Sequence, residues 1–278
     1  MVSKLNKRKL IDNTLKAGIW FSAIFTVGIL FWIIGYIVIN GIGEIDLKFL
    51  TTMPSGEKGG ILPMIVSTIY IVLLSILIST PIGVCAAIYL VEYAKQGKLV
   101  RFIRFATESL AGIPSIIFGL FGMIFFVETL KLGWSLLSGA VTLSIMVLPT
   151  IIRTTEEAFK SVPNSYREGS LALGTSKLRT IIKVVLPSAI SGIITAVILS
   201  IGRVVGETAA VYLTAGMTPR IPGSIMESGR TLSVHLYLLA KEGISFKKAY
   251  ATATILIIII IIINFSANRI ALKFKKAR

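Results

Sequence analysis

The sequence is poor in charged residues. Asp, Glu, Lys and Arg make up only 15% of its 278 residues, whereas soluble globular domains average about 25%. Hydrophobic residues make up 54%, and the mean hydropathy is +0.85. Such a chain lacks the polar groups to cover a surface in water, which excludes a soluble enzyme, a disordered chain and a fibrous protein. We therefore expect an integral membrane protein.

Cysteine and histidine are almost absent. The single Cys85 lies in an apolar stretch and has no second thiol in the chain for a disulfide. The single His235 has no metal-ligand partners near it in the sequence, and no Ser, His and Asp arrangement suggests catalysis. A phosphate loop for ATP is also missing, because Gly97-Lys98 lacks both the upstream glycine and the following hydroxyl. We expect no enzyme, cofactor or metal site, and any ATP chemistry would belong to a partner.

Basic residues outnumber acidic ones, 29 to 13, and give a formal charge of +16. They flank apolar runs instead of alternating with aromatic residues, which argues against nucleic acid as a partner and for anionic lipid. Most of them fall on one side of the membrane if the N-terminus is inside. This asymmetry predicts that both termini face the cytoplasm.

The apolar runs define the expected architecture. A helix needs about 20 apolar residues to cross roughly 30 Å of hydrocarbon. Six stretches approach this length: 17–42, 61–91, 110–127, 135–152, 188–212 and 250–267. They predict an all-α integral membrane six-helix bundle. It would comprise a basic segment 1–16, a first span 17–42, a core 61–267 with the other five spans, and a basic tail 268–278.

The longest polar loop, 153–187, falls on the cytoplasmic side of this topology. Pro163 interrupts the chain, and a short helix is expected from about Ser165. Thr175 or Ser176 is placed to cap a further helix that runs to Pro187. The loop therefore predicts a cytoplasmic helix-turn-helix.

This loop resembles the cytoplasmic signature of ATP-binding-cassette (ABC) importer permeases: Glu-Ala-Ala, three residues, Gly, nine residues, Ile, one residue, Leu-Pro. The matching positions here are Glu168, Gly169, Ser170, Gly174, Val184, Leu186 and Pro187. The departures are Gly169 and Ser170 for the two alanines and Val184 for isoleucine. All three are small-for-small or aliphatic-for-aliphatic changes.

The resemblance implies the type I importer permease fold, with this loop docked in a groove of an ATPase subunit. Gly174 would make the tight turn between two short helices, and Glu168 would face the ATPase. The alternative from the residues alone is an amphipathic loop with a purely structural role.

Three further stretches, 111–122, 148–158 and 202–210, are similar to phosphate importer permeases, and the Arg-Thr-Thr-Glu-Glu-Ala run at 153–158 resembles the A type (PstA). This similarity implies a multi-pass subunit of a bacterial or archaeal cell membrane. Its partners would be a second related permease (PstC type), two copies of an ATPase (PstB type), an extracytoplasmic phosphate-binding protein (PstS type) and membrane lipid.

Arg203 and Glu207 lie about midway in the otherwise apolar stretch 188–212. An unpaired charge there costs at least about 2.5 kcal/mol, and two residues four apart in a helix share a face and can pair. Either they form a structural ion pair, or Arg203 offers its guanidinium to passing phosphate while Glu207 holds it in another state. Arg153, at the expected cytoplasmic end of the fourth span, is a second pathway candidate, with fixing of topology as its alternative role.

Three other functions stay open at this point: an importer of another oxyanion such as phosphonate, sulfate or molybdate, a secondary transporter driven by an ion gradient through Arg203 and Glu207, and a membrane sensor scaffold. The docking loop argues against the second, because an ion-driven carrier needs no ATPase. A sensor would bind its ligand without ATP-linked flux.

Overall fold

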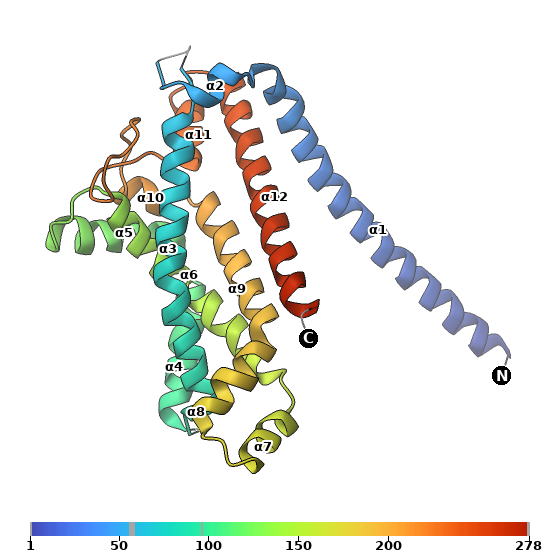
Figure 1. The fold of residues 1–278 in the computed structure, drawn as a ribbon. Helices are drawn as coiled ribbons and strands as arrows, with labels where there is room; N and C mark the ends of the chain where they lie inside the picture. Colours follow the sequence, from blue (N-terminus) through green and yellow to red (C-terminus); the bar gives the residue numbers. More distant parts are fainter. Residues whose placement is uncertain (1, 56–58, 96, 277–278) are drawn as a thin grey trace.

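The computed structural model describes residues 2–55, 59–95 and 97–276, and this part of the chain is helical with no strands (Figure 1). The longer helices are α1 (Val2–Gly41), α3 (Leu62–Ile88), α4 (Lys98–Ala111), α5 (Ser115–Gly122), α6 (Leu136–Lys160), α9 (Leu186–Gly206), α11 (Leu232–Lys241) and α12 (Phe246–Lys276). The shorter ones are α2 (Leu47–Thr51), α7 (Asn164–Ala172), α8 (Lys177–Thr180) and α10 (Ala209–Thr214). Three π-helical segments extend α3, extend α5 and precede α9, at Tyr89–Tyr93, Met123–Thr129 and Ile181–Val185. The predicted all-α membrane fold is confirmed.

Within the described residues, 5 helices are long and apolar enough to cross a membrane, and a bent pair makes up to 6. That pair is Lys98–Ala111 with Ser115–Thr129, at an angle of 100°. A straight third span over 110–127 is therefore wrong. Pro114 has no N–H to donate and disfavours helical geometry at Ile113 before it, so α4 ends and α5 starts in a new direction.

The fifth span is also displaced from the expected 188–212, because its continuous helix runs over Lys177–Gly206 and ends six residues early. Helix α9 ends at Gly206, Glu207 is extended (φ −73°, ψ 127°), and α10 starts at Ala209. Two bonds hold this break: Glu207 Oε1 accepts from the Ala210 N–H at 3.2 Å, and Ser233 Oγ donates to the Glu207 carbonyl at 2.7 Å. The helix ends here because its neighbours satisfy the backbone groups that the break exposes.

Helix α6 is the central element, since 61% of its membrane window is buried, the largest share among the spans. It packs along α3, where Ser144 Oγ donates to the Ser75 carbonyl at 3.0 Å. Gly83 of α3 lies so close to Ile151 of α6 that an added Cβ would come within 2.6 Å of its side chain. Small residues thus let the two backbones approach closely, as is usual between membrane helices.

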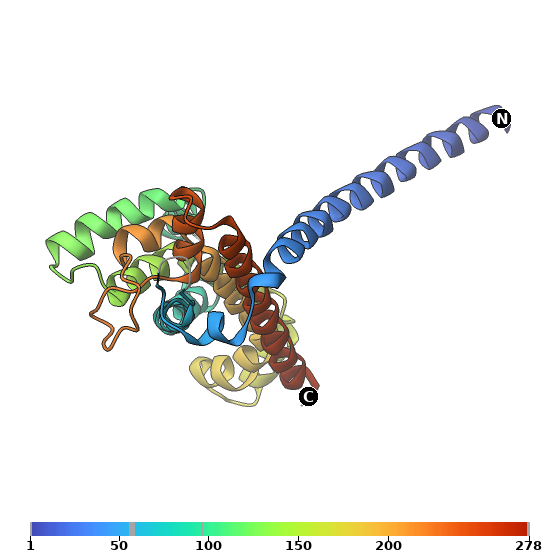
Figure 2. The same ribbon diagram turned by 90° about the horizontal axis from the view of Figure 1, so that it is seen from above.

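Helix α1 leaves the bundle at an angle (Figures 1 and 2). None of its membrane window is buried. It meets α12 near its own C-terminal end, where Gly41 abuts the Tyr250 carbonyl and the rings of Tyr36 and Tyr250 pack edge to face with centroids 5.7 Å apart. The exposed apolar side chains between Ile11 and Ile39 are left for lipid or for another subunit.

The two ends of the bundle carry different elements. Helices α2 and α11 lie at one end, and α7 and α8 lie at the other (Figure 1). At the α11 end, the Leu232 N–H donates to Thr68 Oγ1 at 3.0 Å, and the same hydroxyl donates to the Met64 carbonyl at 2.7 Å. This pair of bonds fixes the start of α11 to the upper part of α3.

Candidate functional site

The loop between α6 and α9 folds as the expected helix-turn-helix. Helix α6 continues to Lys160, so the connecting segment is shorter than the expected 153–187. It consists of α7, a turn and α8. Gly174 makes the turn with φ +77°, a left-handed conformation that other residues avoid. Ser176 caps α8 by accepting from the Arg179 N–H at 3.4 Å. We call α7, the turn and α8 the α7–α8 segment.

Hydroxyl groups close this segment on itself. Ser170 Oγ lies 2.8 Å from Thr175 Oγ1 and 2.9 Å from Thr180 Oγ1, and the two threonine hydroxyls are 3.0 Å apart. Ser170 therefore bonds within the segment, while Glu168 and Gly169 are exposed. Nothing lies within 4 Å of a Cβ added to Gly169, so the alanine of the family signature would fit there.

The α7–α8 segment presents apolar side chains to the outside. Leu173, at the turn, is 85% exposed. Other large apolar side chains exposed on this segment or just after it are Tyr166, Leu171, Leu178 and Ile182. Leu186 and Pro187 are half-buried at the start of α9. Several exposed apolar side chains on a polar loop are typical of a protein-docking surface.

An ion pair that sequence reasoning missed anchors this segment. Arg167 Nη2 and Nε contact Glu92 Oε1 at 2.8 and 3.0 Å, and the two side chains are only 17% and 8% exposed. The same guanidinium donates to the Phe159 carbonyl at 2.8 Å and to the Val162 carbonyl at 2.7 Å. Arg167 thus joins α7 to the ends of both α3 and α6. The only signal in the sequence was an arginine next to Glu168, and nothing local pointed to Glu92.

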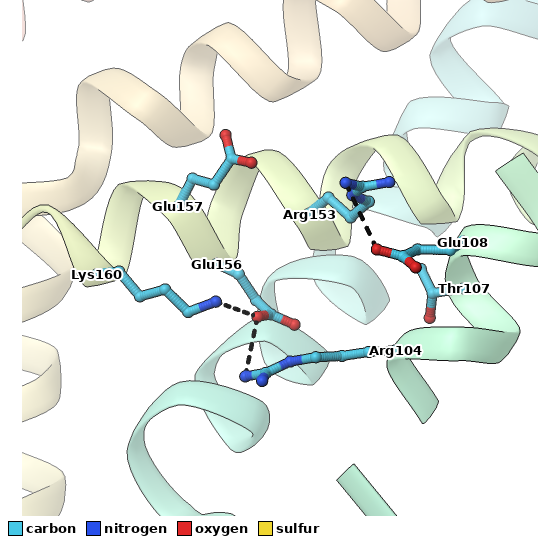
Figure 3. A pocket seen from close by; sticks show the side chains of 7 residues that line it. All are labelled: Arg104, Thr107, Glu108, Arg153, Glu156, Glu157 and Lys160. Atoms are coloured by element: carbon cyan, nitrogen blue, oxygen red, sulfur yellow. Dashed lines mark hydrogen bonds and ion pairs between the residues drawn. The ribbon is translucent and has the colours of Figure 1, made fainter. Parts of the chain in front are cut away.

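Arg153 lines a cavity of about 150 Å³ between α4 and α6 (Figure 3). Its Nη2 lies 3.7 Å from Glu108 Oε1, and the two side chains are 52% and 59% exposed. On the same cavity Glu156 is nearly buried and contacts Arg104 at 3.3 Å and Lys160 at 2.9 Å. The structure therefore places Arg153 in a group of charges from two helices.

The two ion-pair groups of this cavity differ in strength. An exposed pair contributes only about 0.2–1 kcal/mol, because water and salt screen it. Breaking a buried pair leaves a desolvated charge and costs about 3–5 kcal/mol. The Glu156 cluster therefore holds α4 on α6, whereas the Arg153–Glu108 pair is easily exchanged.

Arg203 lies in the last turn of α9 and is half-buried. The expectation that Arg203 and Glu207 share a helix face is wrong, because α9 ends between them. Among the described residues no ion pair joins the two, and the Glu207 carboxylate instead caps α10. The structure thus leaves the Arg203 guanidinium without an intrahelical counter-ion.

His235 is buried in α11, outside the membrane-spanning helices. Its Nδ1 lies 3.5 Å from Arg230 Nη1. Burial, together with the positive charges of Arg230 and Lys248, lowers the pKa of His235 from 6.5 to about 4. The imidazole is therefore neutral at physiological pH.

The sequence matches one family model. The model described as "Binding-protein-dependent transport system inner membrane component" covers residues 79–277. The chain belongs to this family. The matched region includes α4 to α12, with the α7–α8 segment and Arg203, whereas α1 lies before it.

Relatives extend the similarity to as much as 96% of the chain. The "Probable ABC transporter permease protein YqgI" of Bacillus subtilis is 37% identical over 252 residues, which are 85% of this chain and 86% of that protein. The "Phosphate transport system permease protein PstA" of Pasteurella multocida is 37% identical over 212 residues, 75% of either chain. The "Phosphate transport system permease protein PstA 1" of Mycobacterium tuberculosis is 30% identical over 277 residues, 96% of this chain and about nine-tenths of that one.

Solved structures share the fold at low identity. A bacterial alginate ABC transporter matches with a TM-score of 0.68 and 15% identity, over 93% of this chain and 95% of that one. The MetNI methionine ABC transporter matches with a TM-score of 0.65 and 21% identity, over 77% of this chain and 95% of that one. Both are ABC transporters, and the shared fold agrees with the expected permease architecture.

Proposed function

We propose that this chain is a transmembrane permease subunit of an ATP-driven importer of inorganic phosphate. It would form half of the translocation pathway and bind the ATPase through the α7–α8 segment. The observation that carries the proposal is the exposed apolar surface of this segment around Leu173, held rigid by Arg167, in a chain whose relatives are named phosphate permeases.

Energy would enter through this docking surface. An ATPase that moves α7 would also move α3 and α6, because Arg167 binds both, and α8 continues through a π-helical segment into α9. Glu168 and Gly169 would contact the ATPase directly, and Gly174 would set the angle between the two short helices. Leu186 and Pro187 would pass the motion on, because α9 begins with them. Such rigid-body motion is a common form of switching.

Arg203 would contact phosphate on its path. A planar guanidinium suits bidentate binding of phosphate oxygens, and a polar group at membrane depth is tolerated where it lines an aqueous path. Because the Glu207 carboxylate caps α10, it would not neutralise Arg203, and the guanidinium would be available to the anion. Arg153 would be a second contact, nearer the α7 end.

The assembly would contain a second, PstC-type permease, two PstB-type ATPase subunits and a PstS-type phosphate-binding protein outside the membrane. The basic segment 1–16 and the tail 268–278, whose last two residues lie outside the described part of the chain, would face the cytoplasm. Figure 1 supports this, since α1 starts and α12 ends toward the end that carries α7. The core would be 61–267, with the first span at 17–42 added to it.

The test is uptake of radiolabelled phosphate by proteoliposomes that contain the purified complex and its binding protein. We expect uptake to require ATP, to resist competition by sulfate, molybdate and phosphonate, and to be lost in Gly174→Asp and strongly reduced in Arg203→Gln. Glu207→Gln keeps an acceptor for the α10 cap, so it isolates the role of the charge. Uptake without ATP would favour an ion-gradient carrier instead, and selective competition by another oxyanion would change the substrate.

A further inference from the structure

The cavity beside Arg153 contains two kinds of cation. Arg104 and Lys160 both contact the nearly buried Glu156, so neither cation can leave without weakening the pairing of a desolvated carboxylate. Within the described residues, the ion pair of Arg153 is with the exposed Glu108, at the long distance of 3.7 Å. Figure 3 shows Arg153 and Glu108 facing each other from α6 and α4, at the side of the cavity away from Lys160.

We propose that this cavity is the site from which the transported anion is released into the cytoplasm, with Glu108 as the residue that displaces it from Arg153. The inference rests on the proposed function. Phosphate would bind Arg153 when Glu108 swings away, and the return of Glu108 would expel it. Glu108 is thus a specificity and release residue for the permeation path, a role distinct from docking or energy input.

The charge balance of the cavity supports release over storage. Three cations and three carboxylates line it, so a phosphate dianion gains little net attraction from the site as a whole. An exposed ion pair is weak enough for phosphate to replace and strong enough to compete with it at equilibrium. A pathway must hold its ion loosely at the exit.

The position of the cavity connects it with the ATPase dock. Lys160 and Glu156 lie in the last two turns of α6, and Arg167 of α7 bonds to the Phe159 carbonyl between them in sequence. The Glu156 cluster keeps α4 attached to α6 during movement of this end. Movement of α7 therefore acts on both partners of the Arg153–Glu108 pair.

Proteoliposomes are loaded with ATP and with increasing concentrations of unlabelled phosphate, and the uptake of labelled phosphate from outside is measured. Sodium chloride at matched ionic strength replaces the internal phosphate in the control. We expect the internal phosphate concentration that halves the rate to fall about three-fold in Glu108→Gln, as suits loss of one exposed ion pair. The double variant Glu108→Gln with Arg153→Gln should lose this added sensitivity. Glu157→Gln is the matched control for net charge, because it removes the same charge from the cavity lining while the Glu157 carboxylate points away from Arg153 in Figure 3.

The outcomes separate the two proposals. If wild-type uptake does not depend on ATP or does not carry phosphate, the proposed function is wrong. Suppose instead that the wild type imports phosphate, and that internal phosphate inhibits Glu108→Gln and Glu157→Gln at the same concentration as the wild type. The proposed release site is then wrong, and Glu108 has only a structural role. Should Glu108→Gln fail to assemble, Arg153→Gln decides alone: inhibition by internal phosphate should weaken relative to wild type, and unchanged inhibition overturns the proposal.

Discussion

The Arg167 guanidinium and the Glu92 carboxylate form a nearly buried ion pair at 2.8 Å that fastens α7 to the end of α3. The pair joins residues 75 positions apart, and Arg167 belongs to the same α7–α8 segment that carries the exposed apolar side chains. A docking surface transmits force only if it is held by the structure behind it. Arg167 provides this support through four hydrogen bonds to Glu92, Phe159 and Val162.

The first prediction concerns this pair. Arg167→Ala leaves a buried carboxylate unpaired and removes one hydrogen bond from each of two backbone carbonyls, so we expect a loss of about 3–5 kcal/mol in local stability and loss of phosphate-stimulated ATP hydrolysis by the reconstituted complex. Arg179→Ala, an exposed arginine of α8, is the control for local stability and should leave it unchanged. Equal effects of the two variants would show that only the charge of the loop matters.

The second prediction compares two glycines. Gly174→Ala places a side chain at φ +77° and should destabilise the turn by about 1–2 kcal/mol, with reduced coupling of ATP hydrolysis to uptake. Gly169→Ala lies in α7 with open space around its Cβ, so helix propensity predicts a gain of up to about 1 kcal/mol. Thermal unfolding and coupled uptake measure both. A reversed order would mean that the turn differs from the left-handed form.

The third prediction tests the docking surface. Leu173→Glu adds a charge to a residue that is 85% exposed, so the permease itself should keep its melting temperature. Binding of the ATPase subunit should weaken by at least about ten-fold, because a buried apolar anchor at an interface is replaced by an unpaired charge. Leu173→Met keeps an apolar side chain and should bind as the wild type does. Co-purification and titration of the ATPase provide the measurement, and undiminished binding of the Glu variant would place the dock elsewhere.

The fourth prediction concerns pH. The pKa of His235 is lowered to about 4 by burial and by the nearby charges of Arg230 and Lys248. An unfolded histidine takes up a proton below about pH 6.5. The contribution of the neutral His235 to the free energy of unfolding is therefore complete above that pH, and it declines as the pH falls from 6.5 to 4. The full loss is about 3 kcal/mol. The drop in melting temperature between pH 7.5 and 4.5 should therefore be larger in the wild type than in His235→Gln, and equal drops would contradict the assignment.

Sequence reasoning succeeded where the determining forces are local. Hydropathy located the membrane helices, and the position of Gly174 in the signature located the left-handed turn. The bend at Pro114 also had a local signal, the proline itself, but the uninterrupted apolar run around it predicted a single span.

It failed where the partners are distant. The end of α9 depends on Ser233, 26 residues beyond Glu207, and the anchor of α7 depends on Glu92. The partner of Arg153, Glu108, lies on α4 at a position set by the 100° bend. No pattern within one segment encodes such pairs, because they arise only when the helices pack.

The bond between the Leu232 N–H and Thr68 Oγ1 sets an order of events during synthesis. It joins residues 164 positions apart, and at about 5–20 residues per second a ribosome needs roughly 10–30 s to cover that distance. By the end of this interval α3 and α6 have been synthesised, and within the described residues the Thr68 hydroxyl has until then its donor bond to Met64 alone. The contact between α3 and α11 therefore stays incomplete until residue 232 has been synthesised, and α12 can pack on α11 only after that.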